Sequence, residues 1–305
     1  MRHKKPTVSL CVTAYRESVR GGCGWILECI EAACNSTFID EIVVVNDGTL
    51  DFPELASALR DIPKLRFVQN PKRLHVFGNK LESVWQATTD WVLMCDSDNI
   101  MDEAYYVNLL KIRPWQDDVW YAASRANPIF DYRAFVGTWD IKSLVDSVTL
   151  DYKMFWCMVN TGNQFVHRNT FLSVFGHLRG TRFDLTQPDY FGVDDRRDEK
   201  WFLTYGANDS FFMLKEWMLS GNRICVVDGL EYGHRMGDKI TSNYERGPDE
   251  KSMIPPAYFM EMRDFVDGES HTYAVDQTFS LITRMVRDGE EVIFLNHKTG
   301  LYCRG

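Results

Sequence analysis

The sequence lacks the features that mark several large classes of protein. Its eight cysteines form no CxxC pair, and several fall within apolar runs, where a buried thiol packs as a small hydrophobe. No apolar run approaches the roughly 18 residues that a membrane-spanning helix needs. The N-terminal stretch MRHKKPTVSLCVTAY has basic residues but no apolar signal region. We therefore expect a protein of a reducing compartment, cytoplasmic and without a transmembrane segment.

Basic charge is scarce as well. The chain has 34 Lys and Arg against 43 Asp and Glu, a formal net charge of -9 and a pI near 5.3. Such a chain has no basic field for a phosphate backbone, so we expect no nucleic-acid partner. An anionic substrate would need a metal ion or a few well-placed cations. With 305 residues, 45% of them hydrophobic, the chain can form one large domain or two intimate halves.

Short apolar runs alternate with amphipathic stretches along the first hundred residues. This order is typical of strand, helix and strand units that build a parallel sheet. The first expected helix carries apolar residues at helical spacing, namely Ile26, Leu27, Ile30 and Ala33. The expected strands cover residues 7–15, 41–48, 65–70 and 91–95, and the expected helices cover residues 24–36, 53–62 and 78–89.

Two aspartates, Asp96 and Asp98, follow the strand WVLMC. Ligands of open α/β sheets bind outside the carboxyl ends of the strands, and residues two apart in an extended chain point the same way. Both carboxylates can therefore address one hard cation, such as Mg²⁺ or Mn²⁺ bound to a diphosphate. The alternative is a solvated turn, because Asp and Asn are common turn residues, and a D-x-D pair taken alone favours it.

The remaining two thirds of the chain are less regular. The segment 185–201 is polar and charged and predicts a surface loop, and 241–256 has the composition of a linker. Gly221 would end the helix ANDSFFMLKEWMLSG. Expected helices cover residues 101–112, 207–221 and 278–286, expected strands cover 118–126 and 223–234, residues 163–176 read as a strand followed by a helix, and residues 290–305 resemble a hairpin.

Six motifs occur in one order along the chain: VTAYRES, VVVNDGTLD, DSD, NTGNQFVHRNTFLSVFG, GAND and EYGHRMGDKITSN. With these motifs the chain resembles the family 2 type of glycosyltransferase with the GT-A fold, over roughly residues 7–245. The resemblance implies an α/β fold with a Rossmann-like mixed, mainly parallel central sheet flanked by helices. Residues 1–100 would form the nucleotide-sugar-binding half, 101–247 the acceptor-binding and catalytic half of the same domain, and 248–305 a C-terminal α/β extension.

The resemblance also implies a reaction and a site. The reaction is a metal-dependent, inverting transfer of a sugar from a nucleotide-diphosphate sugar, UDP- or GDP-linked, to a hydroxyl of a glycan or glycoconjugate. Asp98 would bind Mn²⁺ or Mg²⁺ with Asp96 and His234, and Asp209 would be the general base. The residues implied for the nucleotide sugar are Thr13, Ala14, Tyr15, Glu17, Asp47, Lys80, Asp96 and Ser97.

Three positions depart from the family pattern. Asn46 stands where the family often has an Asp, Lys80 where an Arg is usual, and Asn208 where an acidic residue precedes Asp209. Each implied role also has a structural alternative, because Asp47 can be a turn residue before Gly48 and Lys80 a solvated helix residue.

Three further implied residues have alternatives of the same kind. Asp209 can be an N-cap, since Asp at a helix start accepts hydrogen bonds from backbone N–H groups. Tyr15 can simply cap the core, and a lone His234 at a strand end is ordinarily a structural residue.

Other classes of protein remain as alternatives. A non-catalytic sugar- or nucleotide-binding protein of the same fold is the main one, because Asn208 weakens the expected acidic pair. A sugar nucleotidyltransferase would need a glycine-rich, basic phosphate loop after the first strand, where this chain has VTAYRES. A dinucleotide oxidoreductase is disfavoured because no G-x-G-x-x-G follows a strand.

Overall fold

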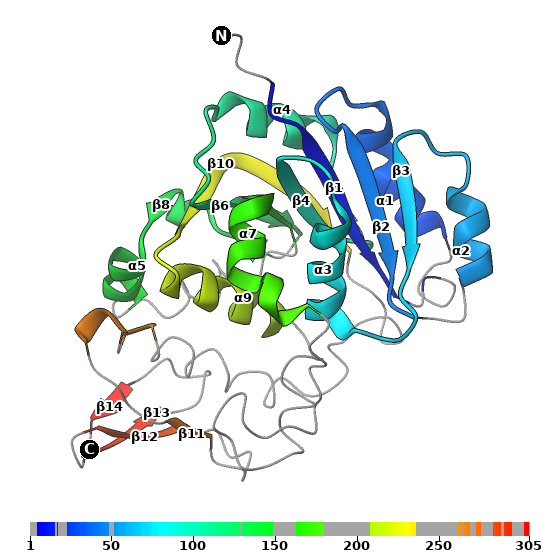
Figure 1. Cartoon of the computed structure of the whole chain (residues 1–305). Coiled ribbons are helices and arrows are strands. Elements are labelled where there is room, and N and C mark those ends of the chain that lie inside the picture. Colours follow the sequence, from blue (N-terminus) through cyan, green and yellow to red (C-terminus); the bar gives the residue numbers. More distant parts are fainter. Residues whose placement is uncertain are drawn as a thin grey trace.

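The chain folds around one large mixed sheet, seen in a computed structural model (Figure 1). The structure describes residues 5–15, 17, 23–48, 52–128, 130–148, 163–179, 208–235, 262–263, 265–268, 273–275, 283–287, 290–294 and 302–304. The main path of the sheet is, in spatial order, β3 (Leu65–Gln69), β2 (Glu41–Asn46), β1 (Val8–Ala14), β4 (Trp91–Asp96), β9 (Gln164–His167), β6 (Val119–Asn127), β10 (Arg223–His234) and β5 (Asn99–Ile100). Two short strands lie off this path, β7 (Phe130–Asp131) on β6 and β8 (Gly137–Trp139) on β10.

Most of the long strands run in one direction. Strands β3, β2, β1 and β4 are mutually parallel, and β10 is parallel to β6. Strand β9 is antiparallel to both β4 and β6, so β6 and β10 run the same way as β1. The carboxyl ends of β1, β2, β4, β6 and β10 therefore lie at one edge of the sheet, as predicted for a mainly parallel α/β fold.

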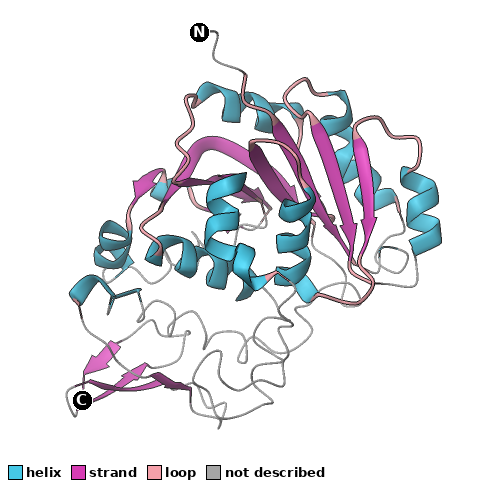
Figure 2. Cartoon of the chain, in the orientation of Figure 1, coloured by secondary structure: helices cyan, strands magenta, loops and turns pink. Residues whose placement is uncertain are grey.

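Helices cover both faces of this sheet (Figure 2). One face packs against α1 (Gly24–Asn35), α2 (Phe52–Leu59) and α4 (Glu103–Lys111), and the other against α3 (His75–Gln86), α7 (Arg168–Phe175) and α9 (Asn208–Leu219). Three more helical elements lie in this part of the chain: η2 (Arg133–Phe135), α5 (Ile141–Val148) and η3 (Gly176–Leu178).

The apolar runs of the central strands are explained by this double cover. In β1, Leu10 and Val12 pack on the α1 side while Cys11 packs on the α3 side, and all three are fully buried. Successive side chains of a strand alternate between faces, so a strand covered on both sides is apolar throughout. Burying one such side chain contributes about 1.5–3 kcal/mol, which makes these strands the centre of stability.

Helices α1 and α3 form where they were predicted, with one correction to the buried face of α1 and one to the start of α3. The face predicted for α1 is wrong at Leu27, which is 38% exposed, and Cys29 takes its place in the core. Helix α3 begins at His75, earlier than predicted, because Asp47 on β2's end accepts a hydrogen bond from the N–H of Leu74 at 2.5 Å. That cap comes from a distant part of the chain, so no local signal announces it.

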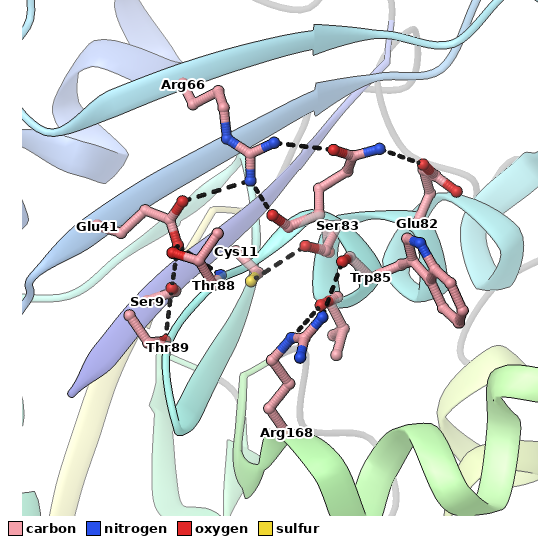
Figure 3. Close-up of polar contacts among 12 residues, drawn as sticks. Ser9, Cys11, Glu41, Arg66, Glu82, Ser83, Trp85, Thr88, Thr89 and Arg168 are labelled. Atoms are coloured by element: carbon pink, nitrogen blue, oxygen red, sulfur yellow. Dashed lines mark hydrogen bonds and ion pairs between the residues drawn. The ribbon is translucent and has the colours of Figure 1, made fainter. Parts of the chain in front are cut away.

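The opposite end of α3 is fixed by side chains from three other elements (Figure 3). The last carbonyls of a helix have no partner within it. Here the carbonyls of residues 83–86 accept hydrogen bonds from Cys11 Sγ at 3.5 Å, from Arg168 at 3.1 and 3.0 Å, and from Arg66. Arg66 in turn pairs with Glu41 at 3.3 Å. Side chains of β1, β3 and α7 thus hold the end of α3, and β2 supports one of them, Arg66, through Glu41.

A second sheet forms in the C-terminal part of the chain. It is antiparallel, with the order β11 (Tyr273–Val275), β12 (Thr283–Arg287), β13 (Glu290–Phe294) and β14 (Tyr302–Arg304). The hairpin-like end is confirmed, but the helix predicted over 278–286 is wrong at 283–287, where pairing in register with β13 overrides local helical spacing. The predicted loop 185–201 and linker 241–256 lie outside the described residues.

None of the helices in the described part of the chain combines the length and the apolar character that a membrane span requires.

Candidate functional site

The two aspartates of the DSD motif lie in a turn that is anchored by the serine between them. Asp96 is the last residue of β4, and Ser97 and Asp98 form the turn before β5, so the prediction of an extended chain here is wrong. Ser97 is 1% exposed, donates its hydroxyl to Glu17 Oε1 at 2.6 Å and its N–H to the Thr13 carbonyl at 3.3 Å. With Ser97 held inward, the carboxylates on both sides of it are left partly exposed.

Asp96 is placed by two polar side chains. Its Oδ1 atom lies 3.2 Å from Lys80 Nζ and accepts a hydrogen bond from Thr13 Oγ1 at 3.3 Å. The Lys80 side chain is only 2% exposed, so the alternative of a solvated helix lysine is wrong. Within the described ranges Oδ2 of Asp96 has no partner, and the carboxylate is 34% exposed. Asp96 can therefore accept a further ligand while Lys80 holds its position.

A second group of side chains gathers at the ends of β1 and β2. The guanidinium of Arg73 lies 4.3 Å from the centre of the Tyr15 ring, and its Nε is 3.8 Å from Asp47 Oδ2. Arg73 is half exposed, whereas Asp47 is buried. Sequence reasoning missed Arg73, because it lies in the loop NPKRL, which carries no motif.

Gly48 lets that loop approach β2. It has φ +66°, and a Cβ added there would lie 2.7 Å from the backbone of Arg73 and of Lys72. A side chain at this position would push the loop away from Asp47. The turn at Asn46–Gly48 therefore does not exclude a role of Asp47 in ligand binding. The turn allows the loop with Arg73 to lie beside the Asp47 carboxylate.

A buried asparagine joins these strand ends. Asn79 of α3 donates to the carbonyls of Val45 at 3.2 Å and Ala14 at 3.5 Å, and accepts from Asn70 at 2.9 Å. Ala14, one of the predicted nucleotide-sugar residues, is fully buried, and its carbonyl also accepts from the N–H of Asp47 at 2.9 Å. Ala14 thus shapes the site through its backbone.

His234 lies at the same edge of the sheet, at the end of β10. Strands β5 and β10 pair so that Asn99 faces His234, and Asn99 Oδ1 is 3.0 Å from His234 Nδ1. Nε2 of His234 has no partner in the part of the chain that the structure describes. Among the described residues, no group of three or more His, Cys, Asp or Glu side chains is arranged to hold a metal ion, so Asp96, Asp98 and His234 do not form a preassembled set.

The predicted base lies at the start of α9. Asp209 is the second residue of that helix, which begins at Asn208, but the side chains of both residues lie outside the described part. The choice between a general base and an N-cap stays a prediction. Gly221, with φ +82°, ends the turn after the helix as predicted.

Two thiols lie behind the aspartate turn. Cys29 and Cys95 are free, with their sulfurs 3.6 Å apart. Burial, together with the neighbouring Cys29 and Asp96, raises the pKa of the Cys95 thiol well above its usual value. A thiol that stays protonated is a poor nucleophile, and both side chains are part of the hydrophobic core, so we assign Cys95 a packing role.

Comparisons with known proteins concern the sequence and the fold of the chain. Residues 9–121 match the sequence model of glycosyl transferase family 2. No curated protein sequence matches the chain.

Three solved structures illustrate the fold. The mannosyltransferase PcManGT from Pyrobaculum calidifontis, in complex with GDP-Man and Mn²⁺, is similar with a TM-score of 0.51 and 14% identity, covering 88% of this chain and 66% of that one. GalNAc-T7 with UDP, GalNAc and Mn²⁺ gives a TM-score of 0.53 and 12% identity, over 86% of this chain and 48% of that one. Residues 1–349 of S. aureus TarS give a TM-score of 0.50 and 14% identity, over 98% and 99% of the two chains.

The chain spans about two thirds of PcManGT and half of GalNAc-T7, and at these identities the likeness concerns the fold alone. The mainly parallel sheet with helices on both faces is the one these proteins share. Residues 9–121 are therefore similar in sequence to glycosyl transferase family 2, and the chain has the GT-A fold that was predicted for it.

Proposed function

We propose that the chain transfers a sugar from a nucleotide-diphosphate sugar to a hydroxyl of a glycan or glycoconjugate, with inversion at the anomeric carbon and with the help of Mn²⁺ or Mg²⁺. The observation that carries the proposal is the position of Asp96, Asp47 and His234, each at the carboxyl end of its strand, β4, β2 or β10, and so along the same edge of the sheet. That edge is where open α/β sheets bind their ligands.

The nucleobase would bind between the ends of β1 and β2. Tyr15 offers a ring, Asp47 can accept a hydrogen bond from a base N–H, and the Arg73 guanidinium can donate to a base carbonyl. Arg73 is half exposed and lies within reach of both, which supports its movement onto a ligand. Two of the similar structures are complexes with GDP-Man and with UDP, so GDP- and UDP-linked sugars are both candidate donors.

The diphosphate would bind at the aspartate turn. An acidic protein of net charge -9 must offset the charge of a diphosphate, and Lys80 beside Asp96 supplies one fixed cation. The available donors fit Mn²⁺ or Mg²⁺, because these ions combine a few protein carboxylate or imidazole ligands with water and substrate phosphates. Asp98, Asp96 and the Nε2 atom of His234 would hold the ion, which neutralises charge on the departing diphosphate when bound.

The acceptor would be activated at the start of α9. An attacking hydroxyl needs a carboxylate within hydrogen-bond reach to take its proton as the new bond forms. Asp209 is the proposed base, on the basis of the GAND motif and its place at the first turn of α9. We also propose that the protein works in a reducing compartment, such as the cytoplasm, since the six cysteines whose side chains the structure describes are free.

Two measurements test this function. In the first, UDP, GDP and their sugar conjugates are titrated with and without Mn²⁺ while thermal unfolding is followed. A nucleotide at 100 times its dissociation constant stabilises the fold by about 2.7 kcal/mol, which is easily detected. Equal stabilisation in EDTA would exclude the metal role.

In the second, donor hydrolysis and transfer to a panel of sugar acceptors are followed, and NMR reads the anomeric configuration of the product. Retained configuration would exclude the single displacement. Binding without any turnover would favour the non-catalytic sugar-binding protein. Synthesis of a nucleotide sugar from UTP or GTP and a sugar phosphate would establish the nucleotidyltransferase alternative.

A further inference from the structure

Three side chains from distant parts of the sequence form a chain of hydrogen bonds that ends at His234, at the edge of the sheet where we propose that the metal binds. Asn99 Oδ1 lies 3.0 Å from His234 Nδ1, and Asn99 Nδ2 donates to Asn163 Oδ1 at 2.9 Å. Both asparagines are fully buried. Asn99 belongs to the short strand β5 and Asn163 comes directly before β9, so the contact depends on the folding of three separate segments.

The direction of this line determines which nitrogen of His234 carries its proton. Because the Asn99 amide group donates to Asn163, its carbonyl oxygen is turned to His234. An amide oxygen can only accept, so Nδ1 of a neutral His234 must be the donor. Nε2 is then the nitrogen with a lone pair, which is the form that a metal ligand requires.

Two further observations indicate that these amides have more than a structural role. The Phe130 ring stands edge-on to the His234 ring, with the centroids 5.5 Å apart and the planes at 66°, so the imidazole is fixed in orientation as well as in tautomer. Asn163 Nδ2 is buried and has no hydrogen-bond partner in the described structure. A buried amide atom without a partner is unfavourable and calls for an explanation, which a role of Asn163 in orienting Asn99 supplies.

We propose that Asn99, oriented by Asn163, is a positioning residue that holds His234 as the Nδ1–H tautomer and so presents Nε2 to the divalent cation. The proposal rests on the function proposed above, because the Nδ1–H tautomer of His234 matters only if His234 binds the metal ion. Asn99 itself touches neither the cation nor the substrate. Asn99 directly follows the DSD motif. One short segment therefore supplies both the carboxylates of the proposed metal site and the residue that positions His234.

The first test is made on the metal-free, unmodified protein. Nitrogen-15 NMR of the imidazole distinguishes the two neutral tautomers without nucleotide, metal or turnover. The expected result is a protonated Nδ1 and an unprotonated Nε2 at a pH where His234 is neutral. A protonated Nε2 overturns the proposal, even if the protein proves to be an active glycosyltransferase.

The second test uses two variants of similar shape and a control. Asn99→Leu removes the acceptor, and Asn99→Asp keeps an oxygen facing Nδ1. Asn108→Leu is the control, since Asn108 also bonds β10, at the Gly229 carbonyl, but away from His234. The measured quantity is the affinity for Mn²⁺ in the presence of UDP, by titration calorimetry.

We expect a loss of about 10- to 100-fold for Asn99→Leu, the usual cost of losing the partner of a metal-bound histidine. Asn99→Asp should keep the Nδ1–H tautomer and most of the affinity, and Asn108→Leu should be unchanged. Equal affinity in Asn99→Leu and the unmodified protein overturns the proposal. If the unmodified protein itself takes up no Mn²⁺ with UDP while Nδ1 carries the proton, the proposed function fails and the assignment of the tautomer stands.

Discussion

Arg73 and Arg179 make similar contacts at opposite ends of helix α3. Substituting each in turn can distinguish an effect on ligand binding from an effect on stability. Each guanidinium lies 4.3 Å from the centre of an aromatic ring, Arg73 over Tyr15 and Arg179 over Trp85. Each also faces a carboxylate, with Arg73 Nε 3.8 Å from Asp47 and Arg179 Nε 2.9 Å from Glu82. Arg73 lies before the start of α3, at the ligand edge, whereas Arg179 contacts residues of its last turns.

The effect on stability can be estimated from these contacts. The Arg73 side chain is 47% exposed, so its ion pair contributes about 0–1 kcal/mol and its ring contact about 0.5–1 kcal/mol. Arg179 has the shorter contacts, with two hydrogen bonds to Glu82 at 2.9 and 3.1 Å. Arg73→Ala should therefore lower the unfolding temperature by only a few degrees, and Arg179→Ala by at least as much.

Nucleotide affinity should respond in the opposite order. A hydrogen bond from a charged group contributes about 1.5–3 kcal/mol when its partner is desolvated, and each 1.4 kcal/mol is a factor of ten. Arg73→Ala should weaken binding of UDP with Mn²⁺ by about 10- to 100-fold, while Arg179→Ala leaves it unchanged. Calorimetric titration and thermal unfolding of both variants make the comparison. Unchanged or tighter binding by Arg73→Ala would refute the reasoning, because Arg73 would then be only a cover over Tyr15.

Three further predictions concern the carboxylates. Asp98→Asn should abolish the Mn²⁺-dependent part of UDP binding without changing the unfolding temperature, and binding that survives would remove Asp98 from the metal site. Asp209→Asn should keep donor affinity and lower turnover by about 10²- to 10⁴-fold, the range for a lost general base, whereas an N-cap would show almost no effect because Asn caps as well as Asp. Burial would raise the pKa of Glu82, but hydrogen bonds from Arg179 and Gln86 outweigh it and lower the pKa, so this carboxylate stabilises the fold above pH 4.5, and that contribution is lost as the pH falls further. Glu82→Gln should flatten the acid limb of a stability–pH curve, and an unchanged limb would contradict the assignment.

The fold could be predicted further than the site. Apolar runs such as EIVVVN and WVLMC predict buried strands because a strand covered on both faces must be apolar at every position. Sequence also indicated which aspartates follow those strands, since strand ends and ligand edges coincide. These inferences need only residues that are neighbours along the chain.

The contacts that the sequence could not predict are between residues far apart in it. Asn99 and His234 are 135 residues apart and meet only through the pairing of β5 with β10. Arg73 acquires its position from Asp47 and Gly48, neither of which marks it in the sequence. The strand at Thr283–Arg287 has the same origin, because its partner strand determines its conformation.

The anchoring of Ser97 has a consequence for the entropy of the proposed cation binding. Its backbone and hydroxyl are both fixed before any ligand arrives, by the contacts to Thr13 and Glu17. Ordering the backbone of one residue costs about 1–2 kcal/mol at room temperature, which is roughly a tenfold change in an equilibrium constant. In this protein the turn is already ordered in the folded state, so cation binding to Asp96 and Asp98 would not have to order it. The affinity would then be about tenfold higher than for the same residues in a flexible loop.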